Sequence, residues 1–163
     1  MTQKKGKSTL RIRFHDCDPF NHLNNGRYID YFMNAREDHL RETFGFNIYQ
    51  HAMKTGESWV VFQNQIAYLA PALLNEEVII QSHLIEWGDK NATVEMQMWD
   101  KSKTALKSLL WSKSVHYNVK LKHPISHGEA IKKQFNLGED TKKIDFSFDE
   151  RIIQIKKEGY LPA

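Results

Sequence analysis

The segment that decides the fold, residues 10–36, reads LRIRFHDCDPFNHLNNGRYIDYFMNAR. It begins with Leu10, Ile12 and Phe14 alternating with polar residues, which is the period of a half-buried strand. A polar loop with the turn formers Pro19 and Gly26 follows. The period then becomes helical, and the positions expected to share one buried face are Tyr28, Tyr31, Phe32, Ala35, His39 and Phe44. The segment therefore predicts a strand, a loop and a long helix packed on a sheet.

The rest of the chain supplies the sheet. Asn24 or Asn25 is expected to cap the helix at its start, and Gly45 is expected to end it. Four strand-like runs then follow, at residues 59–69, 77–87, 92–99 and 106–121. The connections at 88–91 and 101–103 are short enough for hairpins. This order predicts an α+β fold, with an antiparallel sheet and a helix on one of its faces.

Composition places the chain among ordinary globular proteins. Its 163 residues suit one domain, with 40% hydrophobic and 26% charged residues. The net charge of +3, with signs interspersed, does not favour nucleic acid as a partner. Cys17 is the one cysteine, so no disulfide framework exists. The absence of a signal peptide or a long apolar run predicts a cytoplasmic protein without membrane insertion.

The sequence changes character after Pro124. Ser126 and Glu129 have capping-box spacing, so a short helix is expected at about 127–137, ended by Gly138. Residues 139–163 are charged and weakly patterned, and we expect them to form an appendage. The expected organisation is a domain at 8–123 and a C-terminal extension at 124–163.

The loop before the helix concentrates groups that do chemistry. It holds two carboxylates, a histidine and three asparagines beside the start of a buried helix. The first turn of a helix has unpaired backbone N–H groups, which stabilise negative charge as an oxyanion hole does. A carboxylate held nearby can attack a carbonyl or deprotonate a water molecule. The residues alone are therefore compatible with attack on a carbonyl, by the carboxylate or by a water molecule.

The same loop carries a family resemblance. The run FHDCDP at 14–19, then HLNN at 22–25, Tyr28, Tyr31 and Ala35-Arg36 resembles the hydroxybenzoyl-CoA thioesterase family of hotdog proteins. The similarity continues through Tyr68-Leu69-Ala70-Pro71 and Glu86-Trp87 with Lys90, and covers about residues 8–121. It implies a hotdog fold, in which an antiparallel sheet wraps around one long central helix, here with a short C-terminal helical extension.

The resemblance assigns roles residue by residue. Asp18 matches the catalytic carboxylate, as nucleophile or general base, and Asn25 matches the residue whose backbone N–H binds the thioester oxygen. His22 matches a pocket residue near the scissile bond. Substrate contacts are implied for Asn24, Tyr28 and Lys90, the last of these near the CoA phosphates. The implied activity is hydrolysis of an acyl-CoA thioester without cofactor or metal, by a homodimer or a dimer of dimers with active sites at the subunit interface.

Two positions depart from the family pattern. Asn21 stands where many relatives have glycine, but asparagine tolerates positive φ, so we expect the turn to survive. Met33 stands where many relatives have glutamate, which removes the obvious helix carboxylate and puts more weight on Asp18.

Other residues of the chain are weaker candidates for chemistry. Asp16 is expected to be structural, bonding loop amides, and Cys17 lies between two aspartates that raise its pKa, so it is a poor nucleophile. His123 and His127 have metal-site spacing but no obvious third ligand. Two alternatives remain open: a hotdog hydratase or dehydratase, and a non-catalytic acyl-CoA binding protein.

Overall fold

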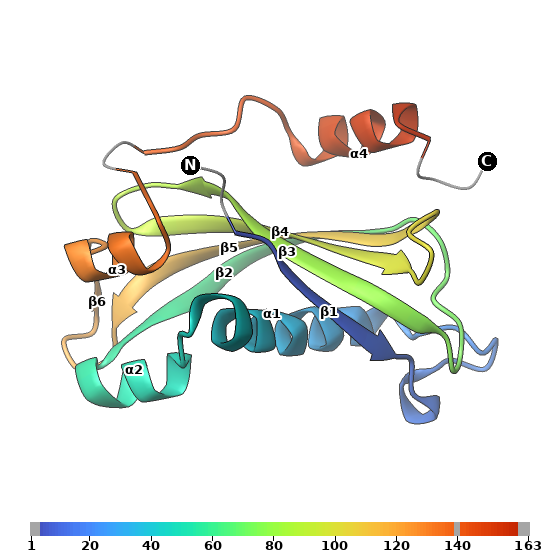
Figure 1. Ribbon diagram of the computed structural model, residues 1–163, viewed down its shortest axis with the longest axis horizontal. Coiled ribbons are helices and arrows are strands. Elements are labelled where there is room, and N and C mark those ends of the chain that lie inside the picture. Colours follow the sequence, from blue (N-terminus) through green and yellow to red (C-terminus); the bar gives the residue numbers. More distant parts are fainter. Residues whose placement is uncertain (1–3, 139–140, 160–163) are drawn as a thin grey trace.

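A curved antiparallel sheet is the frame of the molecule (Figure 1). The computed structural model describes residues 4–138 and 141–159. The strand order is β1-β3-β4-β5-β2, and the short β6 pairs with β5. The strands are β1 (Gly6–Arg11), β2 (Glu57–Tyr68), β3 (Glu77–Trp87), β4 (Asn91–Asp100), β5 (Leu106–Asn118) and β6 (His123–Pro124).

The four later strands were predicted to within three residues at either end, but the first strand was displaced. Strand β1 ends at Arg11, and Phe14 lies 81% exposed in a single 3-10 turn, so the expected alternation through Phe14 was wrong. The ladder stops because the backbone N–H of Arg13 donates to the Tyr31 hydroxyl instead of to a neighbouring strand. Strand β5 ends at Asn118 rather than at residue 121. The Asn118 side chain accepts hydrogen bonds from the backbone N–H groups of Lys120 and Leu121, which forms a turn.

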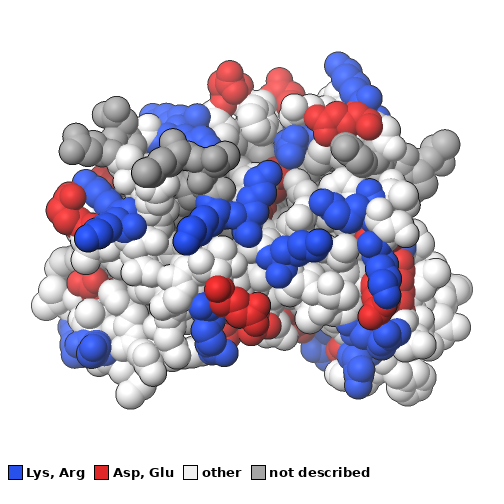
Figure 2. All heavy atoms as spheres, viewed as in Figure 1, with Lys and Arg blue, Asp and Glu red and all other residues white. Residues whose placement is uncertain are grey.

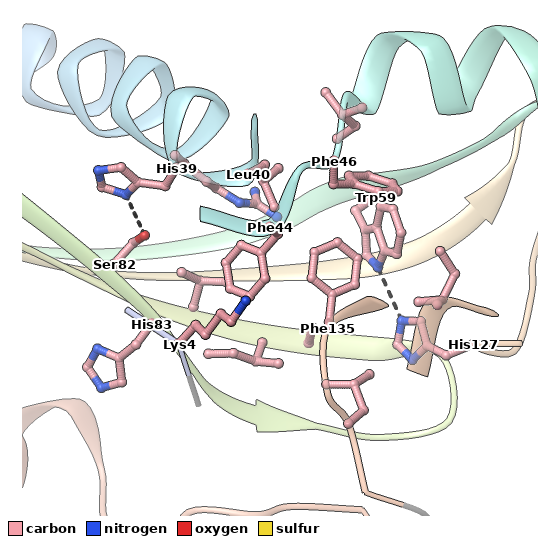
Figure 3. A pocket seen from close by; sticks show the side chains of 17 residues that line it. Lys4, His39, Leu40, Phe44, Phe46, Trp59, Ser82, His83, His127 and Phe135 are labelled. Atoms are coloured by element: carbon pink, nitrogen blue, oxygen red, sulfur yellow. Dashed lines mark hydrogen bonds between the residues drawn. The ribbon is translucent and has the colours of Figure 1, made fainter. Parts of the chain in front are cut away.

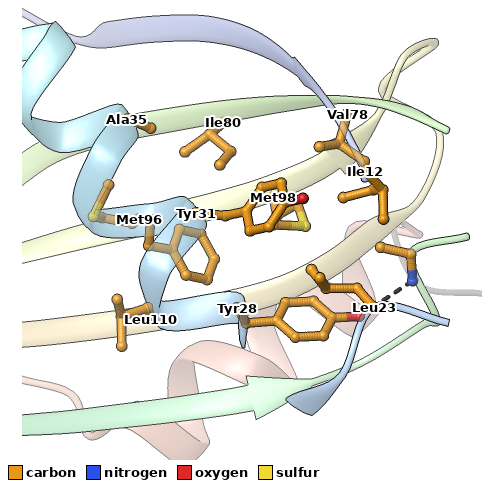
Figure 4. Packing of buried hydrophobic residues seen from close by; sticks show 12 residues of the cluster. Ile12, Leu23, Tyr28, Tyr31, Ala35, Val78, Ile80, Met96, Met98 and Leu110 are labelled. Atoms are coloured by element: carbon orange, nitrogen blue, oxygen red, sulfur yellow. Dashed lines mark hydrogen bonds between the residues drawn. The ribbon is translucent and has the colours of Figure 1, made fainter. Parts of the chain in front are cut away.

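Helix α1 (Tyr28–Phe44) lies against the concave face of the sheet (Figure 1). It ends at Gly45, whose φ of 63° is the left-handed conformation predicted for that position. Figure 4 shows its aromatic and small residues packed on β3, β4 and β5, together with residues of the preceding loop. This core contains Ile12, Leu23, Tyr28, Tyr31, Phe32, Ala35, Ala72, Val78, Ile80, Met96, Met98 and Leu110.

A second helix, α2 (Ile48–Thr55), was not predicted. Asn47 caps its start, and Gly56, with a φ of 76°, turns the chain directly into β2. Both cap residues are visible in the sequence, but the helix has only eight residues and therefore few periods from which to detect it.

From Ile144 onward, the C-terminal region covers the face of the sheet opposite α1 (Figure 1). The segment before it lies beside the end of α1, where the Gln134 side chain donates to the Phe44 carbonyl. Helix α3 (Glu129–Gln134) is shorter than expected, because the Ser126 hydroxyl donates to Asp89 rather than capping it. Helix α4 (Phe148–Lys157) was not predicted, and it begins with a capping box of Ser147 and Glu150. It packs on a second core with Ile79, Ile85, Trp99, Leu106, Leu109, Trp111, Phe148 and Ile155.

The expected weakly patterned appendage is thus largely an ordered cover for the sheet over its described part. Residues 139–140 and 160–163, at its beginning and end, lie outside the described residues. Basic and acidic side chains are interspersed over the face shown in Figure 2, in line with the small net charge of +3. Among the described helices, none combines the length and apolar character needed to cross a bilayer.

Candidate active site

The loop between β1 and α1 holds Asp18 through one oxygen. Oδ1 of Asp18 accepts hydrogen bonds from the backbone N–H groups of Phe20, at 2.9 Å, and His22, at 3.1 Å. The turn passes through Asn21 with a φ of 60°, so the expectation that asparagine sustains this turn is confirmed. Within the described chain, no group donates to Oδ2 of Asp18. One carboxylate oxygen is therefore fixed by the loop, and the other has no hydrogen-bond partner among the described residues.

Asp18 lines a surface cavity of about 240 Å³ together with three more of the predicted site residues. The start of the helix and the segment after β2 form its walls. The lining residues are Asp18, His22, Leu23, Asn25, Tyr28, Tyr68, Leu69, Ala70 and Pro71. The structure thus brings Asp18, His22, Asn25 and Tyr28 together around one space.

The start of the helix offers a free donor to this cavity. Asn24 caps a short 3-10 turn (Asn25–Arg27) that leads into α1, and its side chain accepts from the N–H of Gly26 at 3.0 Å. The N–H of Asn25 donates to no group of the described residues. The backbone carbonyl of Asn25 accepts a hydrogen bond from the Tyr68 hydroxyl at 2.9 Å. An unbonded amide at a positive helix end is the arrangement that stabilises an oxyanion.

Tyr28 forms a wall of the site and has a structural hydroxyl. Its ring is buried and meets the Tyr68 ring edge-on, with centroids 5.1 Å apart. Its oxygen accepts from the Ala72 N–H at 3.2 Å (Figure 4). Burial raises the pKa of the Tyr28 phenol, and the hydrogen bond from Ala72 opposes this only in part. Tyr28 therefore lines the cavity, while its hydroxyl is engaged by the Ala72 backbone.

The second aspartate of the loop has a different partner. The Tyr31 hydroxyl donates to Oδ2 of Asp16 at 2.7 Å and accepts from the Arg13 N–H. Burial, with Asp16 contributing, raises the pKa of Tyr31 to about 12. Asp16 therefore braces the loop against α1, as a structural residue does. Its side chain bonds the Tyr31 hydroxyl and not the loop amides that were expected as its partners. The loop amides of Phe20 and His22 donate to Asp18 instead.

The two weaker candidates are occupied or unreactive. Burial and then the charges of Asp16 and Asp18 raise the pKa of the Cys17 thiol, which disfavours the thiolate. His127 uses both ring nitrogens, since Trp59 donates to its Nε2 at 3.1 Å and its Nδ1 lies 3.0 Å from the Gly88 carbonyl oxygen. The pair of His123 and His127 therefore has no free ligand atom on His127.

Lys90 lies far from this site within one chain. It is exposed in the β3–β4 turn, at the opposite end of the sheet from the loop that carries Asp18 (Figure 1). Strand β3 starts beside Arg11 and spans eleven residues before that turn, or roughly 33 Å. Asp18 and the Lys90 of the same chain are consequently not brought together.

A more enclosed apolar pocket, of about 90 Å³, lies between the C-terminal half of α1 and the sheet (Figure 3). Figure 3 shows Phe44, Phe46, Trp59 and Phe135 converging on it from different elements. At one side His39 of α1 is bonded to Ser82 at 2.6 Å, and burial lowers its pKa. This pocket shares no lining residue with the Asp18 cavity.

Sequence reasoning missed Tyr68, Ala70 and Pro71 as site residues. Tyr68 ends β2, Ala70 and Pro71 follow it, and all three line the cavity. Their run was part of the family resemblance, but nothing in its spacing indicates that Tyr68 anchors Asn25, 43 residues away.

A sequence model of the thioesterase-like superfamily matches residues 12–120, well over half of the chain. The chain belongs to this superfamily. The matched segment runs from the active-site loop through β5 and includes the whole Asp18 cavity. The predicted resemblance to hotdog-fold thioesterases is thereby confirmed.

Solved structures share the fold of this hotdog thioesterase. The probable thioesterase YbaW of Escherichia coli is 20% identical with a TM-score of 0.70, over 78% of this chain and 94% of that one. A Staphylococcus aureus protein solved in complex with CoA is 12% identical with a TM-score of 0.76, over 92% and 94%. The DHNA-CoA thioesterase of Staphylococcus aureus is 13% identical with a TM-score of 0.72, over 97% of each chain. No curated protein sequence matches the chain.

Proposed function

We propose that this thioesterase hydrolyses an acyl-CoA thioester, with Asp18 as the catalytic carboxylate. The observation that carries the proposal is the pairing of a free carboxylate oxygen with an unbonded helix-start amide. Oδ2 of Asp18 and the N–H of Asn25 are both without a partner in the described chain, and both residues line one cavity. A thioester carbonyl placed between them meets a nucleophile or base on one side and an oxyanion donor on the other.

Two routes give the same products. In the first, Oδ2 of Asp18 attacks the thioester carbon, the C–S bond breaks, and CoA leaves as its thiolate. Water then hydrolyses the resulting anhydride and restores the carboxylate. In the second, Asp18 takes a proton from a water molecule that attacks the thioester carbon directly. The C–S bond then breaks, CoA leaves as its thiolate, and Asp18 releases the proton. Both routes place negative charge on the carbonyl oxygen, where the Asn25 amide stabilises it, and His22 and Tyr28 shape the surrounding space.

A second subunit completes the proposed site. Strand β2 is an edge strand in the described sheet and carries exposed apolar side chains, with Phe62 62% and Val60 45% exposed. Such an edge favours pairing with another copy of the chain. Since the Lys90 of one chain is remote from its own Asp18, we propose that the lysine which binds the CoA phosphates is contributed across a homodimer, or within a dimer of dimers.

The choice of CoA as the thiol portion has independent support. A structural neighbour was solved in complex with CoA, and another is a DHNA-CoA thioesterase. Lys90 supplies positive charge of the kind that the CoA phosphates require.

The test is a hydrolysis assay with detection of the released thiol, run on a panel of CoA esters that differ in chain length and aromaticity. We expect turnover of at least one ester and its loss in Asp18→Asn. Binding of CoA esters without thiol release would support the non-catalytic binding protein instead. Addition or removal of water on an unsaturated ester, with the thioester intact, would support the hydratase.

A further inference from the structure

A cluster of two histidines and a glutamate lies away from the active site. His51 of α2, Glu57 of β2 and His116 of β5 each offer one ligand atom, and these atoms lie within 4.8 Å of one another. Nε2 of His51 and Nε2 of His116 are each 3.6 Å from Oε2 of Glu57. Neither distance is that of a hydrogen bond.

The fold brings the three residues together from three elements. In the β2–β5 ladder Trp59 is opposite His116 and Glu57 is opposite Asn118, so the pleat places Glu57, Trp59 and His116 on one face. Gly56 then reverses the chain so that α2 lies beside β2, which adds His51. The Trp59 ring stacks on His116 with centroids 4.6 Å apart and holds the imidazole in place.

The imidazole nitrogens that face Glu57 have no hydrogen-bond partner. Nε2 of His116, whose side chain is 1% exposed, and the buried Nε2 of His51 are both unsatisfied in the described structure. A buried polar atom without a partner costs about 1–3 kcal/mol, and such atoms are rare in native structures. A ligand shared with Glu57 would give both nitrogens a partner.

We propose that His51, Glu57 and His116 bind a divalent zinc-type metal ion. Two imidazoles and a carboxylate are a zinc ligand set, with the fourth position left for water. Around tetrahedral zinc, ligand atoms lie roughly 3.3 Å apart. The two 3.6 Å separations are close to this value, and all three ligand atoms lie within 4.8 Å of one another.

Two groups lie beside the cluster without being ligands. Lys120 packs over Gly56, next to Glu57, and is an exposed residue. His127 itself is engaged by Trp59 and Gly88 and completes the surroundings without being a ligand.

The proposed metal site is separate from the proposed thioesterase site. Glu57 begins β2, while Tyr68, which contacts Asn25 of the active site, ends it. Twelve residues of strand separate the two sites by roughly 35 Å. The ion would tie α2 to β2 and β5, and so stabilise the end of the sheet where the apolar pocket lies.

The test is zinc binding by the full-length, untagged protein. After incubation with zinc and dialysis, we expect about one ion per chain by elemental analysis, and an increase of about 5–10 °C in the melting temperature at roughly 100 times the dissociation constant. Cobalt(II) in place of zinc should produce the intense visible bands of a tetrahedral N/O site. Wild-type protein that holds no stoichiometric zinc and shows no such bands would overturn the proposal.

Matched variants locate the ligands. Glu57→Gln keeps the size of a half-exposed side chain, and we expect it to weaken zinc binding at least 10-fold, as His116→Ala should if it folds. His123→Ala removes an exposed histidine and should leave zinc binding unchanged. Equal zinc binding by Glu57→Gln and wild type, with circular dichroism confirming the fold of both, would remove this cluster as the site. Thioester hydrolysis by metal-free protein is expected to persist, so this test is independent of the proposed function.

Discussion

Glu95 of β4 accepts hydrogen bonds from both Nε and Nη2 of Arg151 on α4, each at 3.0 Å. The Glu95 side chain is 1% exposed, and Trp111 donates to the same carboxylate at 2.9 Å. This bidentate pair gives both carboxylate oxygens a hydrogen-bond partner and joins α4 to the face of the sheet opposite α1. Burial by itself would raise the pKa of Glu95, but the hydrogen bonds from Arg151 and Trp111 outweigh it, and the pKa is lowered.

Arg151→Ala should therefore be strongly destabilising. It leaves the Glu95 carboxylate buried without its cation, and breaking such a pair costs about 3–5 kcal/mol. Urea unfolding monitored by circular dichroism measures the loss. Lys156→Ala removes an exposed charge from the same helix and should change stability by less than about 0.5 kcal/mol. Equal stability of the two variants would mean that α4 does not dock through this pair.

The same pair predicts a loss of stability in acid. The pKa of Glu95 in the folded protein lies below the value of about 4.3 for an unfolded chain. The pair therefore contributes its full share of the unfolding free energy above about pH 4.3. The contribution disappears as the pH falls through the folded pKa. Unfolding free energies measured between about pH 3 and pH 7 should fall more steeply below about pH 4.3 in wild type than in Glu95→Gln. Parallel curves for the two proteins would contradict this.

Asp18→Asn should abolish turnover and preserve the fold. The amide oxygen can still accept from Phe20 and His22, while the free oxygen becomes an NH₂ group that neither attacks nor takes a proton. We expect kcat to fall about 100-fold or more, or roughly 3 kcal/mol of barrier. Asp16→Asn is the control, since it weakens the bond to Tyr31 and should lower stability more than the chemical step. Near-normal turnover by folded Asp18→Asn would refute the mechanism.

Phe62→Asp should dissociate the proposed dimer. It places a charge on the exposed edge strand, where pairing would bury it. Light scattering should then report the chain mass of 19.2 kDa, against at least twice this value for wild type. Met53→Asp, on an 82% exposed residue of α2, is the matched control and should stay oligomeric. Monomeric wild-type protein would exclude a shared active site.

Lys90→Ala should raise KM for CoA esters more than it lowers kcat, because the contact is remote from the bond that breaks. The effect should shrink as salt is added, since phosphate contacts are screened. Lys156→Ala removes a positive charge from α4 and should leave KM unchanged. An unaltered KM for Lys90→Ala at low salt would remove this lysine from the site.

The loop that carries the candidate site was largely predictable because its signals are local. The change of period at Tyr28, the left-handed turns at Asn21 and Gly45, and the proximity of Asp18 to the helix start all depend on neighbours within a few residues. Such features report which face of an element is buried and where it ends. They are encoded in spacing, so one sequence was enough to predict the α+β layout and the candidate carboxylate.

Only the tertiary structure decided which distant residues meet. Tyr68 reaches Asn25 across 43 residues, Arg151 reaches Glu95 across 56, and His51 joins His116 through the register of β2 on β5. No local period records these pairs, because they depend on strand register and on how a helix lies over the sheet. The sequence by itself therefore determined the elements and the chemistry of one loop, whereas packing decided the docking of α4 and the convergence of the histidine cluster.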